Sequence, residues 1–226
     1  MLSDHKKDNA FLIDGLLQGK VELLYVRDNV VAGVHVDTGV VMVCLDTAEE
    51  GREVLPFLPK DCRLLLHNCE EFVPIVQEHL GLEAGEPCYQ SVYTQKVSLP
   101  VAHKDIRPYP LEELDFAVAN YGGEEEREYL RDRICKKDFF AAYEGDKIVG
   151  FSGVHAGGSL GLLYVDPGYR RGSVGSSLAS YLVNLSLARG GLPYAHIRVH
   201  NEPSLKMQEK MGLYVGKKKI FWMYKK

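Results

Sequence analysis

The segment from Leu162 to Ser176 constrains this chain most, because it joins an apolar run to a long helical pattern through a basic loop. Its sequence, LLYVDPGYRRGSVGS, predicts a strand, a turn and then a helix. The first backbone N–H groups of a helix have no intrahelical acceptor and lie at the positive end of its dipole. Arg170 and Arg171 bring two positive charges to the same place. The segment therefore predicts a binding site for a diphosphate or a similar anion.

The distribution of charge supports an anion site in the second half of the chain. Residues 1–97 contain 8 basic and 16 acidic residues, whereas residues 98–226 contain 19 basic and 15 acidic residues. This excess is small and mixed with acidic residues, so it does not form the basic stripe of a nucleic-acid-binding protein. The 162–176 segment also lacks the GxxxxGK pattern of a P-loop, and no GxGxxG follows its strand.

The composition is typical of a soluble globular protein, with 46% hydrophobic and 26% charged residues. The N-terminus lacks the apolar core of a signal peptide, and no apolar run approaches the ~20 residues that span a bilayer. We therefore expect a cytoplasmic protein with no membrane partner. The five cysteines have no CxxC spacing, which suits reduced thiols, and we expect no metal site.

A cluster of prolines over residues 98–110 predicts a linker between two units, 1–100 and 101–226. Hydrophobic periodicity and turn residues predict the elements of each unit. The first unit is expected to contain helices at 9–17, 48–57 and 71–80, an antiparallel meander at 21–26, 30–36 and 40–45, and strands at 63–66 and 89–97. The second is expected to contain helices at 111–120, 124–136, 172–188 and 201–211, and strands at 139–143, 147–154, 160–165, 196–199 and 219–224.

The two units have similar sequences at two places. Residues 25–35 (YVRDNVVAGVH) resemble residues 143–155 (YEGDKIVGFSGVH), and residues 77–82 (QEHLGL) resemble residues 208–213 (QEKMGL). We interpret the similarity as a tandem repeat in which one copy has diverged. The alternative is a chance likeness between hairpins and helix ends.

The second unit resembles the GNAT acetyltransferase superfamily, whose signature is Arg/Gln-x-x-Gly-x-Gly/Ala after a strand. Residues 170–175 (RRGSVG) match it with one departure, since Ser173 occupies the first signature glycine. The similarity continues through residues 201–204 (NEPS) and 208–213 (QEKMGL), and it covers about residues 104–226. The resemblance implies an α/β (α+β) GNAT fold with a mixed, mostly antiparallel sheet flanked by helices in two tandem units. It also implies acetyl-CoA as cosubstrate.

The resemblance assigns roles to particular residues. Leu163 and Val165 would offer backbone groups to pantetheine. Asn201 would contact the pantetheine arm or its thioester end, although an ordinary helix N-cap is the alternative for this residue. The diphosphate would be held by a run of loop and helix residues, namely Arg170, Arg171, Gly172, Ser173, Val174, Gly175 and Ser176.

The first unit is not expected to bind coenzyme A. The segment that corresponds to the phosphate loop there is 46–51 (DTAEEG), and the carboxylates of Glu49 and Glu50 would repel a diphosphate. A structural role is the simplest expectation for this copy. Shaping the acceptor pocket, or forming a homodimer, are the alternatives.

Attack on a thioester requires a neutral amine, and a lysine-like amine with a pKa of ~10.4 is almost wholly protonated at neutral pH. A general base is therefore expected. His155 and Ser159 flank a glycine-containing turn beside the expected thioester, which makes them the catalytic candidates; a surface hairpin histidine is the alternative for His155. Many GNAT enzymes use a tyrosine as acid where this chain has Gln208, which cannot donate an acidic proton. Three tyrosines are available for this role, with packing as the simpler explanation for each, namely Tyr164, Tyr169 and Tyr214.

These observations lead to one hypothesis and two alternatives. The chain is expected to be an N-acyltransferase, most simply an N-acetyltransferase, that transfers the acyl group of acetyl-CoA to an amine of a small molecule, an amino acid or a protein. A non-catalytic protein that binds or senses acyl-CoA is the first alternative, because Gln208 replaces the expected acid. A purely structural interaction domain is the second.

Overall fold

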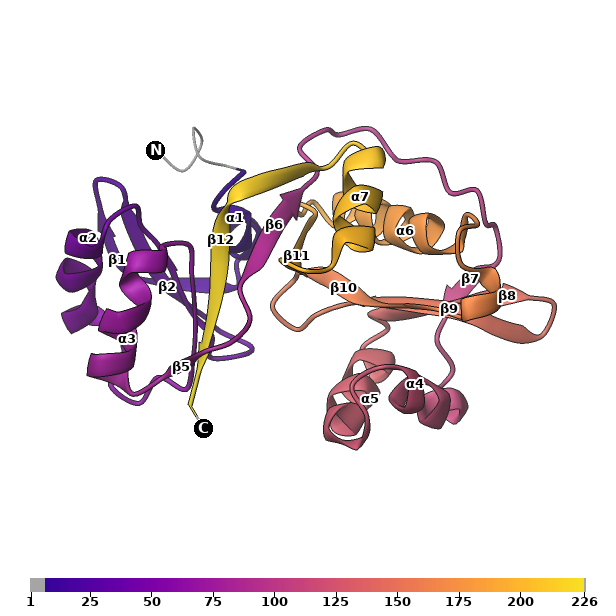
Figure 1. The fold of residues 1–226 in the computed structure, drawn as a ribbon, viewed down its shortest axis with the longest axis horizontal. Helices are drawn as coiled ribbons and strands as arrows, with labels where there is room; N and C mark the ends of the chain where they lie inside the picture. Colours follow the sequence, from indigo (N-terminus) through magenta and orange to yellow (C-terminus); the bar gives the residue numbers. More distant parts are fainter. Residues whose placement is uncertain (1–6, 226) are drawn as a thin grey trace. The chain divides into compact units, whose positions relative to one another are not determined.

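Two β-sheets organise the chain, and each belongs to its own packing unit (Figure 1). The computed structural model describes residues 7–225. Unit 1 combines Met1–Thr94 with Gly190–Lys226, and unit 2 is Gln95–Arg189. The end of the chain therefore packs with its beginning. The predicted domain boundary between residues 100 and 101 stays a prediction.

Unit 1 contains an eight-stranded sheet with the order β1-β2-β3-β4-β12-β6-β11, and β5 pairs with β12. Its elements are α1 (Ala10–Leu17), β1 (Val21–Arg27), β2 (Val30–His35), β3 (Val41–Cys44), α2 (Ala48–Val54), β4 (Leu64–His67), α3 (Val73–Leu80), β5 (Glu83–Ala84), β6 (Cys88–Val92), β11 (Tyr194–Arg198), α7 (Glu202–Lys210) and β12 (Tyr214–Tyr224). The pairs β1–β2 and β2–β3 are antiparallel, which confirms the predicted meander, and β3–β4 is parallel.

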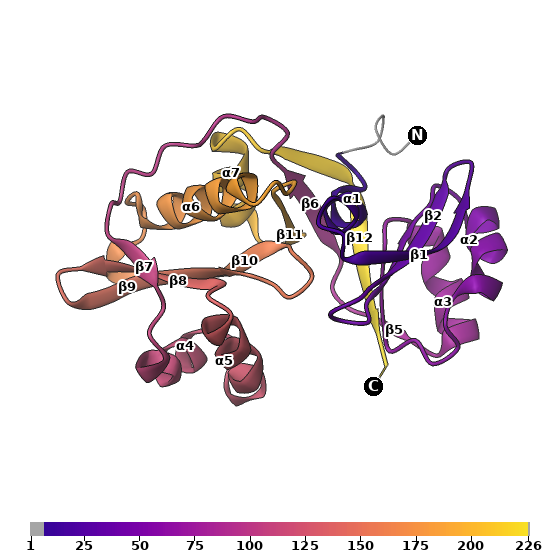
Figure 2. The same cartoon turned by 180° about the vertical axis from the view of Figure 1, so that it is seen from behind.

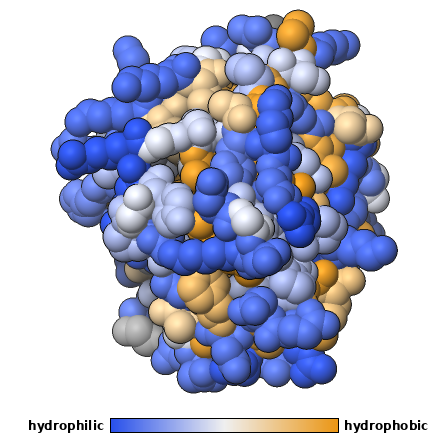
Figure 3. Space-filling model, turned by 90° about the vertical axis from the view of Figure 1, so that its right-hand side faces the viewer, coloured by the Kyte–Doolittle hydropathy of each residue, from blue (hydrophilic) through white to orange (hydrophobic). Residues whose placement is uncertain are grey.

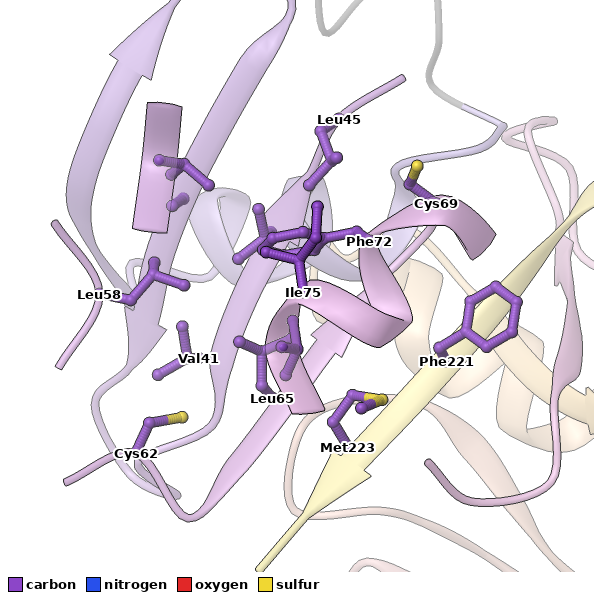
Figure 4. Close-up of a cluster of buried hydrophobic side chains, with 14 of the residues drawn as sticks. Val41, Leu45, Leu58, Cys62, Leu65, Cys69, Phe72, Ile75, Phe221 and Met223 are labelled. Atoms are coloured by element: carbon purple, nitrogen blue, oxygen red, sulfur yellow. The ribbon is translucent and has the colours of Figure 1, made fainter. Parts of the chain in front are cut away.

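The core of unit 1 lies on both faces of its sheet (Figure 1). Val41 and Val43 face the side that α2 and α3 cover, whereas Met42 contributes to the core on the side of α1. Successive side chains of a strand point to opposite faces, so a strand buried on both faces is an unbroken apolar run. Figure 4 shows the first of these cores, in which Phe72 and Leu65 are completely buried.

The last strand is longer than the sequence predicted. β12 begins at Tyr214 instead of residue 219, and its first part pairs with β6 while its end pairs with β4. The lysines at 217–219 interrupt the apolar pattern, which hides this part of the strand from sequence analysis. In the structure Lys218 forms an ion pair with Asp46, and Lys219 lies 3.1 Å from a carboxylate oxygen of Glu70.

Unit 2 contains a four-stranded antiparallel sheet with the order β10-β9-β8-β7. Helices α4 and α5 cover one face and α6 covers the other (Figures 1 and 2). The elements are β7 (Ile106–Pro108), α4 (Leu114–Asn120), α5 (Arg127–Cys135), β8 (Phe139–Glu144), β9 (Lys147–Val154), β10 (Leu160–Val165) and α6 (Val174–Ala188). The predicted linker over 98–110 thus contributes β7 to the sheet.

The two segments of similar sequence have similar local structure. Residues 21–35 form the hairpin β1–β2, in which Asp28 of the turn has a φ of 43°, and residues 139–154 form β8–β9, in which Gly145 has a φ of 62°. Helices α3 and α7 both end at a glycine with positive φ, Gly81 and Gly212. A positive φ favours glycine, so the positions at which these two helices end follow directly from the sequence.

The surface is mostly polar, as is typical of globular proteins. Charged and polar side chains cover most of the face shown in Figure 3, with apolar side chains interspersed among them. Within residues 7–225, no helix has the length and apolar character needed to cross a bilayer.

Asp14 provides a test of the packing in unit 1. This carboxylate on α1 is 6% exposed, and its Oδ1 accepts a hydrogen bond from the N–H of Leu192 at 2.8 Å. Burial raises the pKa of Asp14 to about 6, although the Leu192 N–H and the charge of Lys20 act in the opposite direction. A pKa raised on folding gives stability that is complete below pH 3.8 and is lost as the pH rises through 6.

Replacing Asp14 with Asn keeps the hydrogen-bond acceptor and removes the buried charge. We expect Asp14→Asn to be more stable than the native protein at pH 7.5, by on the order of 2 kcal/mol, with the difference shrinking to near zero below pH 4. Urea unfolding at the two pH values measures it. Equal stability of the two proteins at pH 7.5 would contradict the burial of this carboxylate.

Candidate functional site

The strand β10 lies at one edge of the four-stranded sheet, so no strand of that sheet pairs with its outer side. The N–H of Asp166 donates to the C=O of Val149 at 2.9 Å, and Val165 is aligned with Gly150. Pairing alternates along an antiparallel strand, so Val165 directs its backbone groups away from β9, and its C=O accepts a hydrogen bond from the Nε of Arg170. The outer edge therefore offers N–H and C=O groups to an extended ligand.

A bulge interrupts β10 between Gly161 and Tyr164. Leu162, inside the bulge, has a φ of 53° in the left-handed region, and its side chain is buried in the core of unit 2. The Oγ of Ser152 donates to the C=O of Gly161 at 2.9 Å. A bulge changes the direction of a strand, and left-handed residues other than glycine are strained, so both features mark functional positions.

The turn after β10 is held by the carboxylate of Asp166. This carboxylate accepts hydrogen bonds from the N–H of Gly168 and from the Nζ of Lys147, each at 2.9 Å. Lys147 and the Gly168 N–H hold the pKa of Asp166 below its usual value. The negative charge is thus neutralised within the turn.

The helix α6 begins without a side-chain cap. Ser173 is the N-cap residue, but its side chain accepts no hydrogen bond from the first turn. The first helical bond runs from the N–H of Ser177 to the C=O of Ser173 at 2.8 Å. In the described part of the chain, no acceptor meets the N–H groups of residues 172–176. These amides are therefore available to an external anion.

Two arginines precede these amides, and both are exposed. The Nε of Arg170 donates to the C=O of Val165 at 3.0 Å, which places the guanidinium between the strand edge and the helix start. Arg171 has a φ of 64°, so the backbone turns sharply just before Gly172. The structure thus brings together the loop residues that the sequence assigned to a diphosphate. The two exposed arginines lie next to the backbone N–H groups of residues 172–176, which have no acceptor.

In unit 1, the first backbone N–H groups of helix α2 are satisfied by side chains of the chain itself. Thr47 caps α2, and its Oγ1 accepts the N–H of Glu50 at 3.3 Å. The Oε2 of Glu50 in turn accepts the N–H of Asp46 at 2.6 Å and that of Thr47 at 3.0 Å. β3, which precedes this helix, is paired on both sides. The chain's own carboxylate therefore fills the place that an anion would need.

The two catalytic candidates lie at the turn between β9 and β10. The Nδ1 of His155 is 2.8 Å from the Oη of Tyr129 on α5, and the N–H of Ala156 donates to the same Oη at 3.1 Å. Ser159 is buried, and its C=O accepts the N–H of His155 at 2.8 Å. Sequence analysis did not find Tyr129, because nothing in the sequence links it to a histidine 26 positions away.

The environment of His155 determines its proton affinity. Burial, and next the positive charge of Arg133, lower the pKa of His155 to about 4. Arg133 is itself buried and forms an ion pair with Asp132. His155 is therefore neutral at physiological pH, as a base must be, but it is a weaker base than an ordinary histidine.

Asn201 and Gln208 belong to unit 1. Asn201 caps α7, because its Oδ1 accepts the N–H of Ser204 at 3.2 Å. Its contact with pantetheine stays a prediction. Gln208 is buried, and its Oε1 accepts the hydroxyl of Ser91 at 3.3 Å. Gln208 thus joins α7 to β6.

The tyrosines named as alternative acids have packing contacts. Tyr164 stacks on Phe151, with 5.1 Å between ring centroids. The Nζ of Lys147 lies 5.1 Å from the ring centroid of Tyr169, and the Nζ of Lys7 lies 4.4 Å from that of Tyr214. Among residues 7–225, His, Cys, Asp and Glu side chains form no group of three or more that could hold a metal ion.

Comparison with known proteins gives one family match. Residues 104–213 match the model of the acetyltransferase (GNAT) family. A search of curated proteins gave no match.

Several solved structures have a similar fold. A Drosophila protein has 18% sequence identity and a TM-score of 0.63, and the likeness covers 99% of this chain and 84% of that one. A GNAT-family acetyltransferase from Colwellia psychrerythraea has 15% identity and a TM-score of 0.55, covering 99% and 96% of the two chains. A putative GNAT-family acetyltransferase from Novosphingobium aromaticivorans has 13% sequence identity and a TM-score of 0.55, and the likeness covers 97% of this chain and 98% of that one. At these identities the likeness shows the fold.

The position of His155 predicts its titration. We expect its imidazole to titrate near pH 4 and to stay neutral above about pH 5, because burial and Arg133 oppose protonation. NMR of the imidazole nitrogens as a function of pH measures this value. Since the pKa is lowered on folding, His155 contributes stability that is complete above pH 6.5 and is lost as the pH falls towards 4. A midpoint near 6.5 would contradict the desolvation of this imidazole.

Proposed function

Because residues 104–213 form an acetyltransferase domain of the GNAT family, we propose that this protein transfers the acetyl group of acetyl-CoA to an amine, with the diphosphate held at the start of α6. The observation that carries the proposal is the uncapped N-terminus of α6 next to Arg170 and Arg171. A diphosphate supplies the negative charge and the acceptor oxygens that this arrangement lacks.

The edge of β10 supports the same ligand. Pantetheine contains two amide groups, and these can add to the strand as a peptide would, at Leu163 and at the N–H of Val165, whose C=O already accepts from Arg170. The loop that holds the diphosphate follows directly after β10, so one extended molecule can use both features. In this arrangement the thioester lies towards the start of β10, beside His155 and Ser159.

The first residues of α6 provide a direct test of coenzyme A binding. Ser173→Glu places a carboxylate at the N-cap position of α6, and we expect it to weaken coenzyme A binding at least about tenfold, about 1.4 kcal/mol, because it repels the diphosphate. Ser173→Gln is the matched control, similar in size and uncharged, and should bind within about threefold of the native protein. Isothermal titration calorimetry with coenzyme A measures both. Equal affinities of the two variants would show that the diphosphate lies elsewhere.

The acceptor is an amine of a small molecule, an amino acid or a protein. We expect thiol release from acetyl-CoA to accelerate with at least one member of a panel of amines, amino acids and peptides. The double variant Arg170→Ala/Arg171→Ala should reduce that release at least about tenfold by weakening binding of the donor. Arg52→Ala, on the capped helix α2, is the control and should leave it unchanged. Release that is insensitive to the arginine pair would contradict the proposed site.

A non-catalytic protein that binds or senses acyl-CoA is the second candidate. The observation that favours it is Gln208, which is buried against Ser91 where many GNAT enzymes have a tyrosine acid. The two candidates differ in one result. Tight binding of acetyl-CoA with no thiol release for any acceptor favours the sensor.

Unit 1 is proposed to contain a diverged copy of the same repeat. The similar hairpins β1–β2 and β8–β9 support this relation, and Glu50 supports the idea that the copy does not bind coenzyme A. The contact of Asn201 with pantetheine, self-association into a homodimer and a cytoplasmic location stay predictions from the sequence.

A further inference from the structure

Two hydrogen bonds at Tyr129 determine which nitrogen of His155 carries a proton. The N–H of Ala156 can only donate, so the Oη of Tyr129 accepts that bond at 3.1 Å. The oxygen has a second lone pair, but no other acceptor for the phenol proton lies within hydrogen-bond distance among residues 7–225, so this proton is satisfied when Tyr129 donates it to the Nδ1 of His155 at 2.8 Å. Burial raises the pKa of Tyr129, so the phenol keeps this proton. With Nδ1 as acceptor, a neutral imidazole must carry its own proton on Nε2.

Nε2 lies next to the bulge of β10. A Cβ added to Gly161 would be 2.7 Å from Nε2 and 3.0 Å from Cδ2 of His155, so the imidazole occupies the space that a larger residue would need. Among residues 7–225, the His155 ring makes its hydrogen bond through Nδ1, to Tyr129. Gly161 is four residues before Val165, about 13 Å along a strand, on the side away from the phosphate loop. The Nε2–H group thus lies where the proposed arrangement puts the thioester.

This protonation state does not suit a general base. A base needs an unshared electron pair directed at the substrate, and the pair on Nδ1 is already engaged by Tyr129. The other nitrogen carries a proton. Such a group can donate a hydrogen bond to oxygen, which is how enzymes stabilise the negative charge that develops in acyl transfer.

We propose that His155 donates an Nε2–H hydrogen bond to the carbonyl oxygen of the thioester, and that Tyr129 is the positioning residue that fixes the required tautomer. The inference rests on the proposed acyl-CoA function. It changes the role expected for His155 from proton acceptor to hydrogen-bond donor, and it adds a residue on α5 to the site.

The chemical step is balanced without a proton on His155 moving. The lone pair of a neutral amine forms the C–N bond, and the C=O π electrons move onto oxygen, where Nε2–H stabilises them. When the C=O bond forms again, the C–S bond breaks and its electron pair leaves with sulfur. The extra proton of the amine passes to water or to the departing thiolate. His155 and Tyr129 keep their protons throughout.

Nitrogen-15 NMR of the imidazole tests the tautomer without any turnover. We expect a protonated Nε2 and an unprotonated Nδ1 in the free native protein at pH 7. Tyr129→Phe should convert this to a mixture of tautomers, whereas Tyr181→Phe, a hydroxyl deletion elsewhere in unit 2, should not. Acetyl-CoA should shift the Nε2–H resonance more than coenzyme A without the acyl group. A proton on Nδ1 in the native protein would overturn the inference.

Kinetics with hydroxylamine as the acceptor show whether His155 acts as a hydrogen-bond donor or as a general base. Hydroxylamine is a small amine that is unprotonated at neutral pH, so its reaction with acetyl-CoA needs no base. We expect His155→Leu to lower kcat about 100-fold with this acceptor, the usual effect of losing one oxyanion donor. His155→Gln keeps an N–H donor without basic character and should be at least about tenfold faster than His155→Leu. Equal rates for the two variants would overturn the donor role.

Binding measurements distinguish a failure of the proposed function from a failure of the proposed role of His155. Both His155 variants should bind coenzyme A with the affinity of the native protein, because the diphosphate site is at the other end of β10. Tyr129→Phe should lower kcat and leave KM for acetyl-CoA unchanged, as a positioning role requires. A native protein that does not bind coenzyme A would overturn the proposed function. Normal binding with a wrong tautomer would overturn this inference alone.

Discussion

Backbone hydrogen-bond groups without partners determine where unit 2 can bind a ligand. The outer edge of β10 and the first amides of α6 are contiguous in the chain, and the described structure supplies no acceptor for those amides. An uncovered strand edge and an uncapped helix are each unfavourable by themselves. Strain lies on both sides of them, since Leu162 and Arg171 have positive φ. A chain retains such features together when an extended anionic ligand uses them.

The starts of α2 and α6 differ in how their first backbone amides are satisfied. In α2, Thr47 and Glu50 satisfy the first amides reciprocally, and β3 is paired on both sides. In α6, Ser173 makes no such bond, and a pair of arginines replaces the acidic residues. Both helices follow a strand and a short loop, but the side chains at the start of α2 are acidic and those before α6 are basic. The match of residues 104–213 to the acetyltransferase (GNAT) family model includes the start of α6.

The site near the proposed thioester depends on a proton position that is set from another element. His155 follows β9, Tyr129 lies on α5, and the N–H of Ala156 decides the direction of the hydrogen bond between them. Arg133, one turn further along α5, opposes a positive charge on the imidazole. The chemistry available to a histidine is therefore a property of its neighbours, and an imidazole with a lowered pKa can still donate a hydrogen bond.

The sequence by itself determined the local parts of this protein. The hairpin turns, the glycine stops at Gly81 and Gly212, and the strand, loop and helix around Ser173 all follow from residues close together in the chain, because turn and capping preferences act over a few positions. Only the tertiary structure decided three things. β12 extends through the lysines at 217–219 because β6 supplies a partner, the last residues pack with the first, and Tyr129 sets the proton on His155. Each depends on contacts between residues far apart in sequence, whose energies no local pattern encodes.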